Sequence, residues 1–424
     1  MERMKSTALR LYGKNDLRLE TFDLPEIKDN EVLADVVTDS VCMSTHKAVL
    51  QGADHKRVPK NVANMPIIVG HEQCGTILKV GEALKDKFQV GMKYSLQPAV
   101  NYPGREIEAV GYSYPYVGGD ATRVIIPSDV IEMDCLIPYG GDSFFNASLS
   151  EPISCILGAL KSQYHGKTKE YAHEMGIKDK GRLALLGGAG PMGLGFIDLL
   201  LNGDRKPGLL VVTDIDDVKL HRAERLFPRE EAAQKGVALE FINSSRPDAF
   251  RDLMTRTENK GFDDIFVMVP VSSVAEQASQ LLGYDGCLNV FAGPTDKSFG
   301  AFVNLYHVHY NHHHIMGSTG GNSDDMRQAL DLIGRGVINP AVMITHIGGL
   351  DSAGDTIKNL PNIPGGKKLI YTGISLALTA LEDFVVKAKT DPLFERLAHI
   401  IEKTKGMWSK EAEEFLLANA TPIH

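Results

Sequence analysis

The sequence predicts an α/β protein with two kinds of domain, one rich in short strands and one in which strands alternate with helices. Two observations predict this. Short runs of β-branched residues, separated by glycine turns, fill the chain up to about residue 155. From residue 182 onward, apolar runs alternate with helical segments, as in βαβ units around a parallel sheet. The length of 424 residues fits about two or three domains.

Composition excludes several classes of protein. Hydrophobic residues make up 43% of the chain and charged residues 23%, so it can bury a core. The net charge of −9 argues against nucleic acid or an anionic membrane as the main partner. We find no apolar run of about 18 residues and no apolar core of a secretory signal near the first residue. The five dispersed cysteines predict free thiols in a reduced cytoplasm.

The expected elements follow in chain order. In the first part, strands are expected at 32–37, 67–69, 76–80 and 123–126. In the second part, strands are expected at 182–186, 209–213, 239–242, 264–268 and 287–291, with helices at 218–227 and 271–282 between them. Strands at 342–347 and 368–371 indicate that the chain then returns to the first domain.

Three helix starts are predicted from capping residues. Ser323 is expected to cap a helix that carries Met326, Leu330 and Ile333 on its apolar face. The tail from residue 375 is expected to be helical, with caps at Asp391 and Ser409.

A glycine-rich turn is the strongest local motif. Gly188-x-Gly190-x-x-Gly193 follows an apolar strand and opens a helix. Glycines let the backbone approach a pyrophosphate, and the helix N-terminus supplies N–H donors. Asp214 ends the next strand about 20 residues on, where an acidic residue binds ribose hydroxyls. We predict a dinucleotide site formed by Gly188, Gly190, Pro191, Met192, Gly193 and Asp214.

The carboxylate of Asp214 predicts a preference for NAD(H), because it repels a 2′-phosphate. NADP(H) remains possible, since Lys219, His221 and Arg222 follow closely. The alternative for those three is an exposed helix face.

A second set of residues offers zinc chemistry. Cys42, His71, Glu72 and Glu151 supply thiolate, imidazole and carboxylate, a suitable ligand set with a position left for substrate. Each also has a structural alternative: a small core cysteine, a hydrogen-bonded turn histidine and two solvated acids.

Together these motifs resemble the zinc-dependent medium-chain alcohol and polyol dehydrogenases over residues 6–374. The resemblance is carried by Cys42, Gly70-His71-Glu72, Gly91, Gly119-Asp120-Ala121, Glu151-Pro152, Gly188–Gly193, Asp214 and Gly317-Ser318. It implies a Rossmann dinucleotide-binding domain (156–320) inserted in a β-rich GroES-like catalytic domain (1–155 and 321–374). Residues 375–424 would form a C-terminal helical extension.

The resemblance also implies roles for individual residues. Cys42 and His71 would bind the catalytic zinc, with Glu72 and Glu151 as exchanging carboxylate ligands. Ser44 matches the hydroxyl of the proton relay, so that Ser44 and Glu72 are the expected catalytic residues. Zinc would polarise a carbonyl while hydride moves to or from nicotinamide. Residues 97–116 lack the four cysteines that bind a structural zinc in this family, so one zinc is expected.

Three departures from the family pattern leave the proton path open. Thr45 stands where an aspartate usually supports the metal-bound histidine, and Lys47 stands where a relay histidine is usual. His46 lies one position early.

Closer resemblance points to the sorbose 1-phosphate reductases, through residues 7–13, 51–56, 261–266 and 365–368. This implies interconversion of L-sorbose 1-phosphate and D-glucitol 6-phosphate. His55, Lys56 and Arg57 are candidates for phosphate binding, although a solvated basic loop is the alternative. Two other functions stay open: a zinc-dependent dehydrogenase of an unphosphorylated polyol or other secondary alcohol, and a non-catalytic nucleotide-binding redox sensor.

In the histidine-rich segment 306–314, the alternation His307-x-His309 would place both histidines on one face of a strand. A structural or interface role is favoured over metal binding, because no thiolate or carboxylate lies nearby in sequence. The resemblance implies a homodimer or homotetramer.

Overall fold

The computed structural model describes residues 4–167 and 170–423 and divides into two compact units. Unit 1 comprises Met1–Glu151, Asn322–Gly334 and Ile344–His424, and unit 2 comprises Pro152–Gly321 and Arg335–Met343. The tail after residue 374 thus belongs to unit 1 by its contacts. Among the described residues, we find no helix with the length and apolar character needed to cross a membrane.

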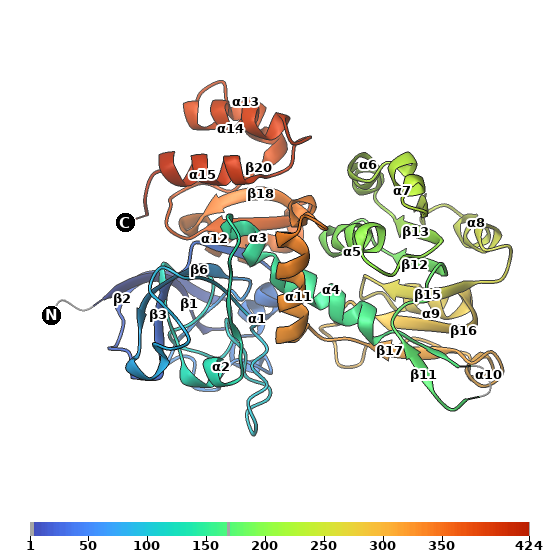
Figure 1. The fold of residues 1–424 in the computed structure, drawn as a ribbon, viewed down its shortest axis with the longest axis horizontal. Coiled ribbons are helices and arrows are strands. Elements are labelled where there is room, and N and C mark those ends of the chain that lie inside the picture. The colour runs from blue at the N-terminus through green and yellow to red at the C-terminus, as the bar shows by residue number, and fades with distance from the viewer. Residues whose placement is uncertain (1–3, 168–169, 424) are drawn as a thin grey trace. The chain divides into compact units, whose positions relative to one another are not determined.

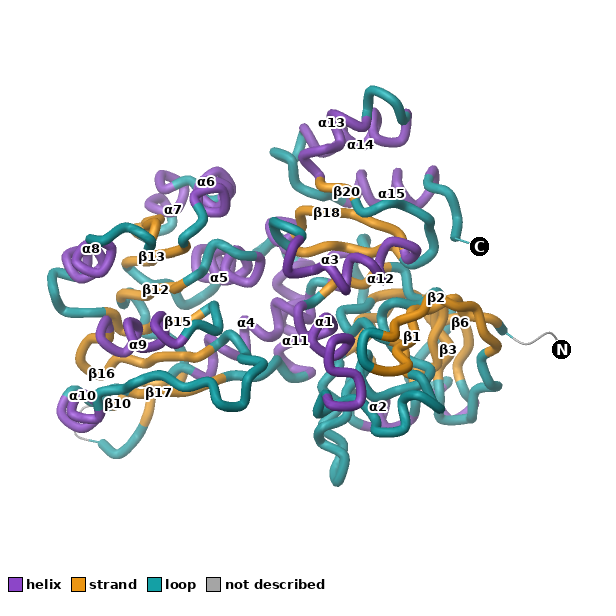
Figure 2. The backbone as a smooth tube through the Cα atoms, turned by 180° about the vertical axis from the view of Figure 1, so that it is seen from behind, coloured by secondary structure: helices purple, strands orange, loops and turns teal. Residues whose placement is uncertain are grey.

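Unit 2 is built on a six-stranded sheet in the order β14-β13-β12-β15-β16-β17, in which every pair is parallel. Its strands are β12 (Arg182–Leu186), β13 (Leu209–Asp214), β14 (Ala238–Asn243), β15 (Phe262–Val267), β16 (Leu282–Val290) and β17 (His314–Gly317), with a hairpin of β10 (Tyr164–Gly166) and β11 (His173–Met175). Its helices are α5 (Pro191–Asn202), α6 (Asp217–Leu226), α7 (Arg229–Gln234), α8 (Ala249–Arg256), α9 (Ser272–Leu281), α10 (Leu305–Tyr310) and η3 (Pro340–Met343). Figure 2 shows α5 and α9 beside the strands of this sheet. The parallel order confirms the predicted α/β fold class.

The central strands β12, β13 and β15 of the unit 2 sheet are largely buried on both faces, as a sheet covered by helices requires. All six residues of β15 are buried, and Ala184, Val211 and Leu288 from three other strands join one core cluster.

Unit 1 combines a nine-stranded sheet and a three-stranded sheet, β2-β1-β5. Its strands are β1 (Lys5–Gly13), β2 (Asp16–Asp23), β3 (Val32–Asp35), β4 (Thr38–Val41), β5 (Ile67–Ile68), β6 (Cys74–Val80), β7 (Lys93–Leu96), β8 (Arg123–Ile126), β9 (Leu136–Pro138), β18 (Ile344–Gly349), β19 (Lys367–Tyr371) and β20 (Thr379–Ala380). Its helices are α1 (Met43–Gln51), η1 (Gly52–Asp54), η2 (Glu82–Leu84), α2 (Ser128–Glu132), α3 (Phe144–Ser148), α11 (Ser323–Gly334), α12 (Leu350–Asn359), η4 (Leu360–Asn362), η5 (Leu381–Asp383), α13 (Phe384–Lys387), α14 (Pro392–Glu402) and α15 (Lys410–Asn419). The boundary at Glu151 falls inside α4 (Ser150–Ser162).

The tail helices α13, α14 and α15 lie together beside β18 and β20 (Figure 1). Asp391 and Ser409 accept hydrogen bonds from Leu393 N and Ala412 N, so both predicted caps are confirmed. Glu413 is 2% exposed, and its carboxylate accepts the N–H groups of Phe144 and Phe145 at 2.7 and 2.8 Å. The tail therefore caps the N-terminus of α3.

Two local predictions are wrong. Asn322, not Ser323, caps α11, because its side chain accepts Asp325 N at 2.8 Å while the Asp325 carboxylate accepts Asn322 N. Residues 305–310 form helix α10, so that His307 and His309 do not share a strand face. The Asn304 side chain starts this helix by accepting Tyr306 N at 3.0 Å.

Candidate functional site

The glycine-rich turn of unit 2 connects β12 to α5. Gly188 N donates to Thr213 O at 2.7 Å, which fixes the turn against the end of β13. A Cβ on Gly193 would lie 1.8 Å from Gly188 O, so only glycine fits there. At Gly190 a Cβ would meet nothing within 4 Å, and α5 begins there without a side-chain cap. An open helix N-terminus of this kind suits a pyrophosphate.

Asp214 lies at the same turn. Its carboxylate accepts Ala189 N at 3.3 Å, Ile215 N at 2.9 Å and Asp216 N at 3.2 Å. These bonds hold the carboxylate beside the glycines, the position expected of a ribose-binding group. Arg222 is engaged elsewhere, since its Nη2 donates to Val342 O at 2.9 Å.

The candidate metal centre of unit 1 contains Cys42, His71 and Glu72. One ligand atom from each lies within 4.8 Å of the other two, and no other group of three such side chains was found in the described residues. Cys42 immediately precedes α1, and His71 follows Gly70, whose φ of +91° favours glycine. The donor set of thiolate, imidazole and carboxylate fits zinc.

Two buried groups hold the carboxylate of Glu72. Lys367 Nζ pairs with one carboxylate oxygen, and Ser40 Oγ donates to the other. Ser148 Oγ also donates to the main-chain carbonyl of Glu72. Burial alone would lower the pKa of Lys367, but the charges of Glu72 and Cys42 outweigh it and raise that pKa. The ammonium therefore stays charged and neutralises a buried acid.

Thr45 and Tyr112 orient the imidazole of His71. Thr45 Oγ1 lies 3.2 Å and the Tyr112 hydroxyl 3.1 Å from Nδ1, while Nε2 lies 4.0 Å from a Glu72 oxygen. Thr45 thus contacts the ring that the family's aspartate would support. Burial lowers the pKa of His71, which favours the neutral imidazole that metals bind.

A chain of hydroxyls leads to the thiol. Tyr112 donates to Ser44 Oγ at 2.7 Å, and Ser44 Oγ donates to Cys42 Sγ at 3.1 Å. Burial raises the pKa of Tyr112 well above its usual value, so its hydroxyl stays protonated and able to donate.

Glu151 is not a member of the three-residue group. It is 8% exposed, and burial raises its pKa to about 7 while the charge of His71 opposes that rise. His46, the other residue left open by the sequence, places Nδ1 2.7 Å from Ile357 O and is a buried structural contact.

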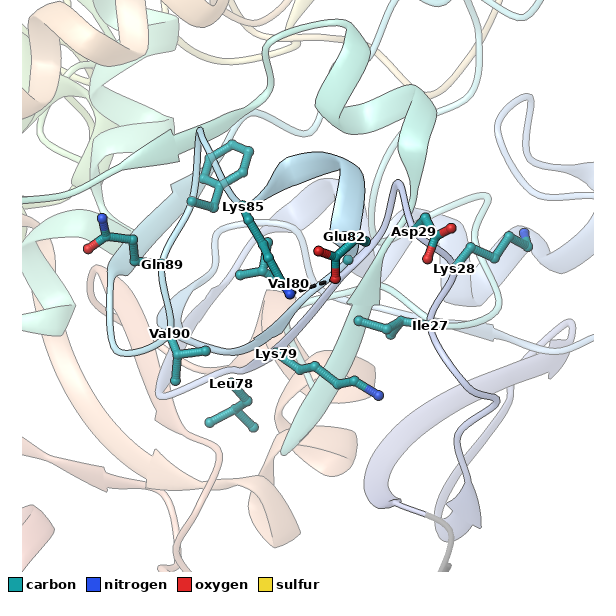
Figure 3. Close-up of a pocket in the computed structure, with 12 residues that line it drawn as sticks. Ile27, Lys28, Asp29, Leu78, Lys79, Val80, Glu82, Lys85, Gln89 and Val90 are labelled. Atoms are coloured by element: carbon teal, nitrogen blue, oxygen red, sulfur yellow. Dashed lines mark hydrogen bonds and ion pairs between the residues drawn. The ribbon is translucent and has the colours of Figure 1, made fainter.

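The cavity in Figure 3 is a separate feature of unit 1. It measures about 620 Å³ and is lined in part by Leu78, Lys85 and Phe88, without any residue of the candidate centre. Lys85 is paired there with Glu82 at 2.5 Å. It therefore adds nothing to the metal centre.

Comparison with known proteins identifies the family. The model "Alcohol dehydrogenase GroES-like domain" matches residues 28–133, and the model "Zinc-binding dehydrogenase" matches residues 209–335. The chain is 48% identical to an L-sorbose 1-phosphate reductase of Klebsiella pneumoniae over 99% of this chain and 98% of the relative. The chain belongs to the zinc-binding dehydrogenase family. This confirms the family predicted from the sequence, and the protein is an oxidoreductase.

Two further comparisons agree with this zinc-binding dehydrogenase assignment. The chain is 48% identical to a mannitol-1-phosphate 5-dehydrogenase of Aliivibrio fischeri, over 97% of both chains. A solved structure from Sinorhizobium meliloti 1021, which contains NADP, matches with a TM-score of 0.69 and 19% identity. It covers 87% of this chain and 100% of its own, so the likeness supports the fold, including the GroES-like and Rossmann parts.

Two residues at the candidate centre of this zinc-binding dehydrogenase, Tyr112 and Lys367, are not predicted by any motif in the sequence. Tyr112 lies in the region 97–116, which is marked in the sequence only by its missing cysteines, and Lys367 lies in the segment 365–368, which carries only the subgroup resemblance. Neither stands in a motif with Cys42, His71 or Glu72. A buried lysine in a strand was the one available signal for Lys367, because such a charge needs an acidic partner.

Proposed function

We propose that the protein reduces a ketose phosphate to a polyol phosphate with NADH, and that the pair is L-sorbose 1-phosphate and D-glucitol 6-phosphate. The observation that carries this proposal is the Cys42–His71–Glu72 group. The full-length similarity to a relative named for L-sorbose 1-phosphate supports the substrate. In the reaction the carbonyl carbon gains a hydride, the carbonyl oxygen gains a proton, and NADH becomes NAD⁺.

Residues of this chain would bind the metal and deliver the proton. Cys42, His71 and Glu72 would hold one zinc ion, with Glu151 as the exchanging carboxylate. When bound, zinc supplies a Lewis acid for the carbonyl oxygen and nicotinamide supplies the hydride. Ser44 would deliver the proton to the product oxygen, and Tyr112, which donates to Ser44 at 2.7 Å, would keep that hydroxyl oriented.

Asp214 would favour NADH, because a carboxylate beside the glycine-rich turn repels a 2′-phosphate. The residues that would bind the dinucleotide are Gly188, Gly190, Pro191, Met192, Gly193 and Asp214. We further propose a cytoplasmic homodimer or homotetramer with a single, catalytic zinc per chain.

A side-by-side assay tests the substrate class. NADH oxidation is followed with L-sorbose and with L-sorbose 1-phosphate, and we expect kcat/KM to be at least about 100-fold higher for the phosphate. Equal values would favour the alternative, a dehydrogenase of an unphosphorylated polyol or other secondary alcohol.

Mannitol 1-phosphate is the second candidate substrate, because a relative of equal identity is named for it. That name places oxidation at C5, four carbons from the phosphorylated C1, whereas D-glucitol 6-phosphate is oxidised next to its phosphorylated carbon. NAD⁺ reduction with the two polyol phosphates, measured at equal concentrations, separates them.

A further inference from the structure

A short basic loop, His55-Lys56-Arg57, follows η1 in unit 1. The guanidinium carbon of Arg57 lies 5.3 Å from the centre of the Tyr112 ring, and the His55 ring stacks on the same ring at 5.8 Å. Ser113 Oγ donates to Arg57 O at 2.7 Å, and Arg57 N donates to His55 Nδ1 at 3.3 Å. The backbone and ring contacts therefore fix where this loop places its charges.

Tyr112 joins the loop to the candidate metal centre. Arg57 and His55 pack against its ring, and its hydroxyl contacts Ser44 and His71. One tyrosine thus separates a guanidinium from the side chains assigned to the carbonyl end of the substrate.

Arg57 differs from other arginines of unit 1 that lie over aromatic rings. Arg10 and Arg18 both lie over Tyr12, but Arg10 is bound by Glu20 at 2.8 Å and Arg18 by Asp16 at 2.6 Å. Within the part of the chain that the structure describes, Arg57 makes no ion pair. A guanidinium whose face rests on a ring keeps its N–H edge for a bidentate anion.

Neighbouring cations reinforce this charge. Burial, together with the charges of Arg57, Lys56 and Lys47, lowers the pKa of His55 to about 4. His55 is therefore neutral near pH 7 and serves as a stacking partner, while the three cations supply an attractive field for an anion.

We propose that Arg57, assisted by the adjacent Lys56, binds the phosphate group of the substrate and thereby selects phosphorylated over free sugars. This inference rests on the proposed function and names the residue responsible for it. Tyr112 acts as a spacer, because it contacts the phosphate-binding arginine with its ring and the carbonyl-side residues with its hydroxyl. It would set the distance between phosphate and reacting carbon.

The test compares Arg57→Met, Arg57→Lys and the matched control Arg18→Met, in which another tyrosine-stacked arginine is removed. For Arg57→Met we expect kcat/KM for the phosphorylated ketose to fall about 10- to 100-fold, mainly through KM. The preference for phosphorylated over free ketose should fall by a similar factor, and inhibition by inorganic phosphate should weaken. Arg57→Lys should recover part of the preference, since it restores charge without the planar fork. Arg18→Met should match the wild type.

The possible results distinguish a failure of the role proposed for Arg57 from a failure of the proposed function. A wild-type enzyme without preference for the phosphorylated ketose contradicts the proposed function itself. A preferring wild type whose Arg57→Met variant keeps the full preference overturns only the role of Arg57. An equal fall for both ketoses also overturns it, because the loop would then act only through the structure of the site.

Discussion

The glycine-rich turn of unit 2 and the candidate metal centre of unit 1 are built in opposite ways. The turn consists of consecutive residues, Gly188–Gly193, and offers backbone N–H groups. The centre consists of side chains from Cys42, His71 and Glu72, supported by Tyr112 and Lys367 from distant parts of the chain. A backbone site depends on local conformation, whereas a side-chain site depends on the fold that assembles it.

The difference also has an energetic side. The turn needs a position without a side chain where the backbone closes on itself, as at Gly193, and hydrogen bonds to the end of β13. The centre buries an acid, and removing one partner of such a buried ion pair costs about 3–5 kcal/mol. Unit 1 therefore stabilises its centre with the buried partners Lys367 and Ser40, while unit 2 holds its turn with glycines and with hydrogen bonds to the end of β13.

The largest effect is expected at the candidate metal centre. Cys42→Ser should reduce turnover by more than about 100-fold and lower the zinc content, since even indirect partners of a metal contribute 10- to 100-fold. Metal analysis and NADH oxidation measure both. Cys135→Ser, a buried cysteine of the same unit that contacts Met133 O, is the control. Full activity in zinc-depleted Cys42→Ser protein would refute a zinc mechanism.

At the glycine-rich turn, a substitution of Gly193 should disrupt the dinucleotide site. Gly193→Val places a side chain against Gly188 O and should weaken NADH binding by roughly 10- to 100-fold, because the turn must open. Fluorescence titration with NADH measures this. Gly334→Ala, where a Cβ meets nothing within 4 Å, is the matched change. Unaltered NADH affinity in Gly193→Val would mean that the turn does not bind the dinucleotide.

A smaller effect should follow when the carboxylate beside the glycine-rich turn is removed. Asp214→Ala should shift the ratio of kcat/KM for NADH over NADPH by about tenfold toward NADPH, because the repulsive carboxylate is gone. Parallel assays with the two cofactors measure this ratio. A constant ratio would place Asp214 away from the ribose.

A substitution in the C-terminal tail, at Glu413, should also affect the candidate metal centre. Glu413 caps α3, and the last residue of that helix, Ser148, bonds the carbonyl of Glu72. Glu413→Gln should therefore cost about 1–3 kcal/mol of stability and lower kcat/KM several-fold at temperatures well below melting. Glu411→Gln, on the exposed face of α15, is the control. A lower melting temperature with unchanged kcat/KM would limit the tail to stabilisation.

The smallest effect is expected at an ion pair of unit 2 outside the turn. Burial would raise the pKa of Asp263, but hydrogen bonds from Arg182 and Lys178 outweigh it and lower the pKa to about 2. Because the folded pKa lies below the unfolded value of 3.8, its contribution is full above about pH 4 and is lost between about pH 4 and pH 2.

Asp263→Asn should therefore lower the free energy of unfolding, measured by urea titration at pH 7, by about 1–2 kcal/mol, and the gap to wild type should narrow below pH 4. Asp16→Asn, which changes an exposed acid, should show little effect at either pH. A gap as large at pH 3 as at pH 7 would contradict the assignment of this pKa.

Prediction from the sequence succeeded where the signal was local. The caps at Asp391 and Ser409 and the strand–turn–helix around Gly190 depend on residues a few positions apart. It erred by one residue at α11, where Asn322 and Asp325 cap each other's N–H groups. It failed at His307 and His309, because two alternating residues do not distinguish a strand from one helical turn.

The sequence by itself determined the two-part α/β fold class, the family, the glycine-rich turn and the identities of Cys42, His71 and Glu72 as candidate ligands. Only the tertiary structure decided that Lys367 and Ser40 hold Glu72, that Tyr112 links Ser44 to Arg57, and that the tail caps α3 through Glu413. The physical reason is the range of each constraint. Turns and caps follow from neighbouring residues, whereas the partner of a buried charge is chosen by strand pairing and packing across hundreds of positions.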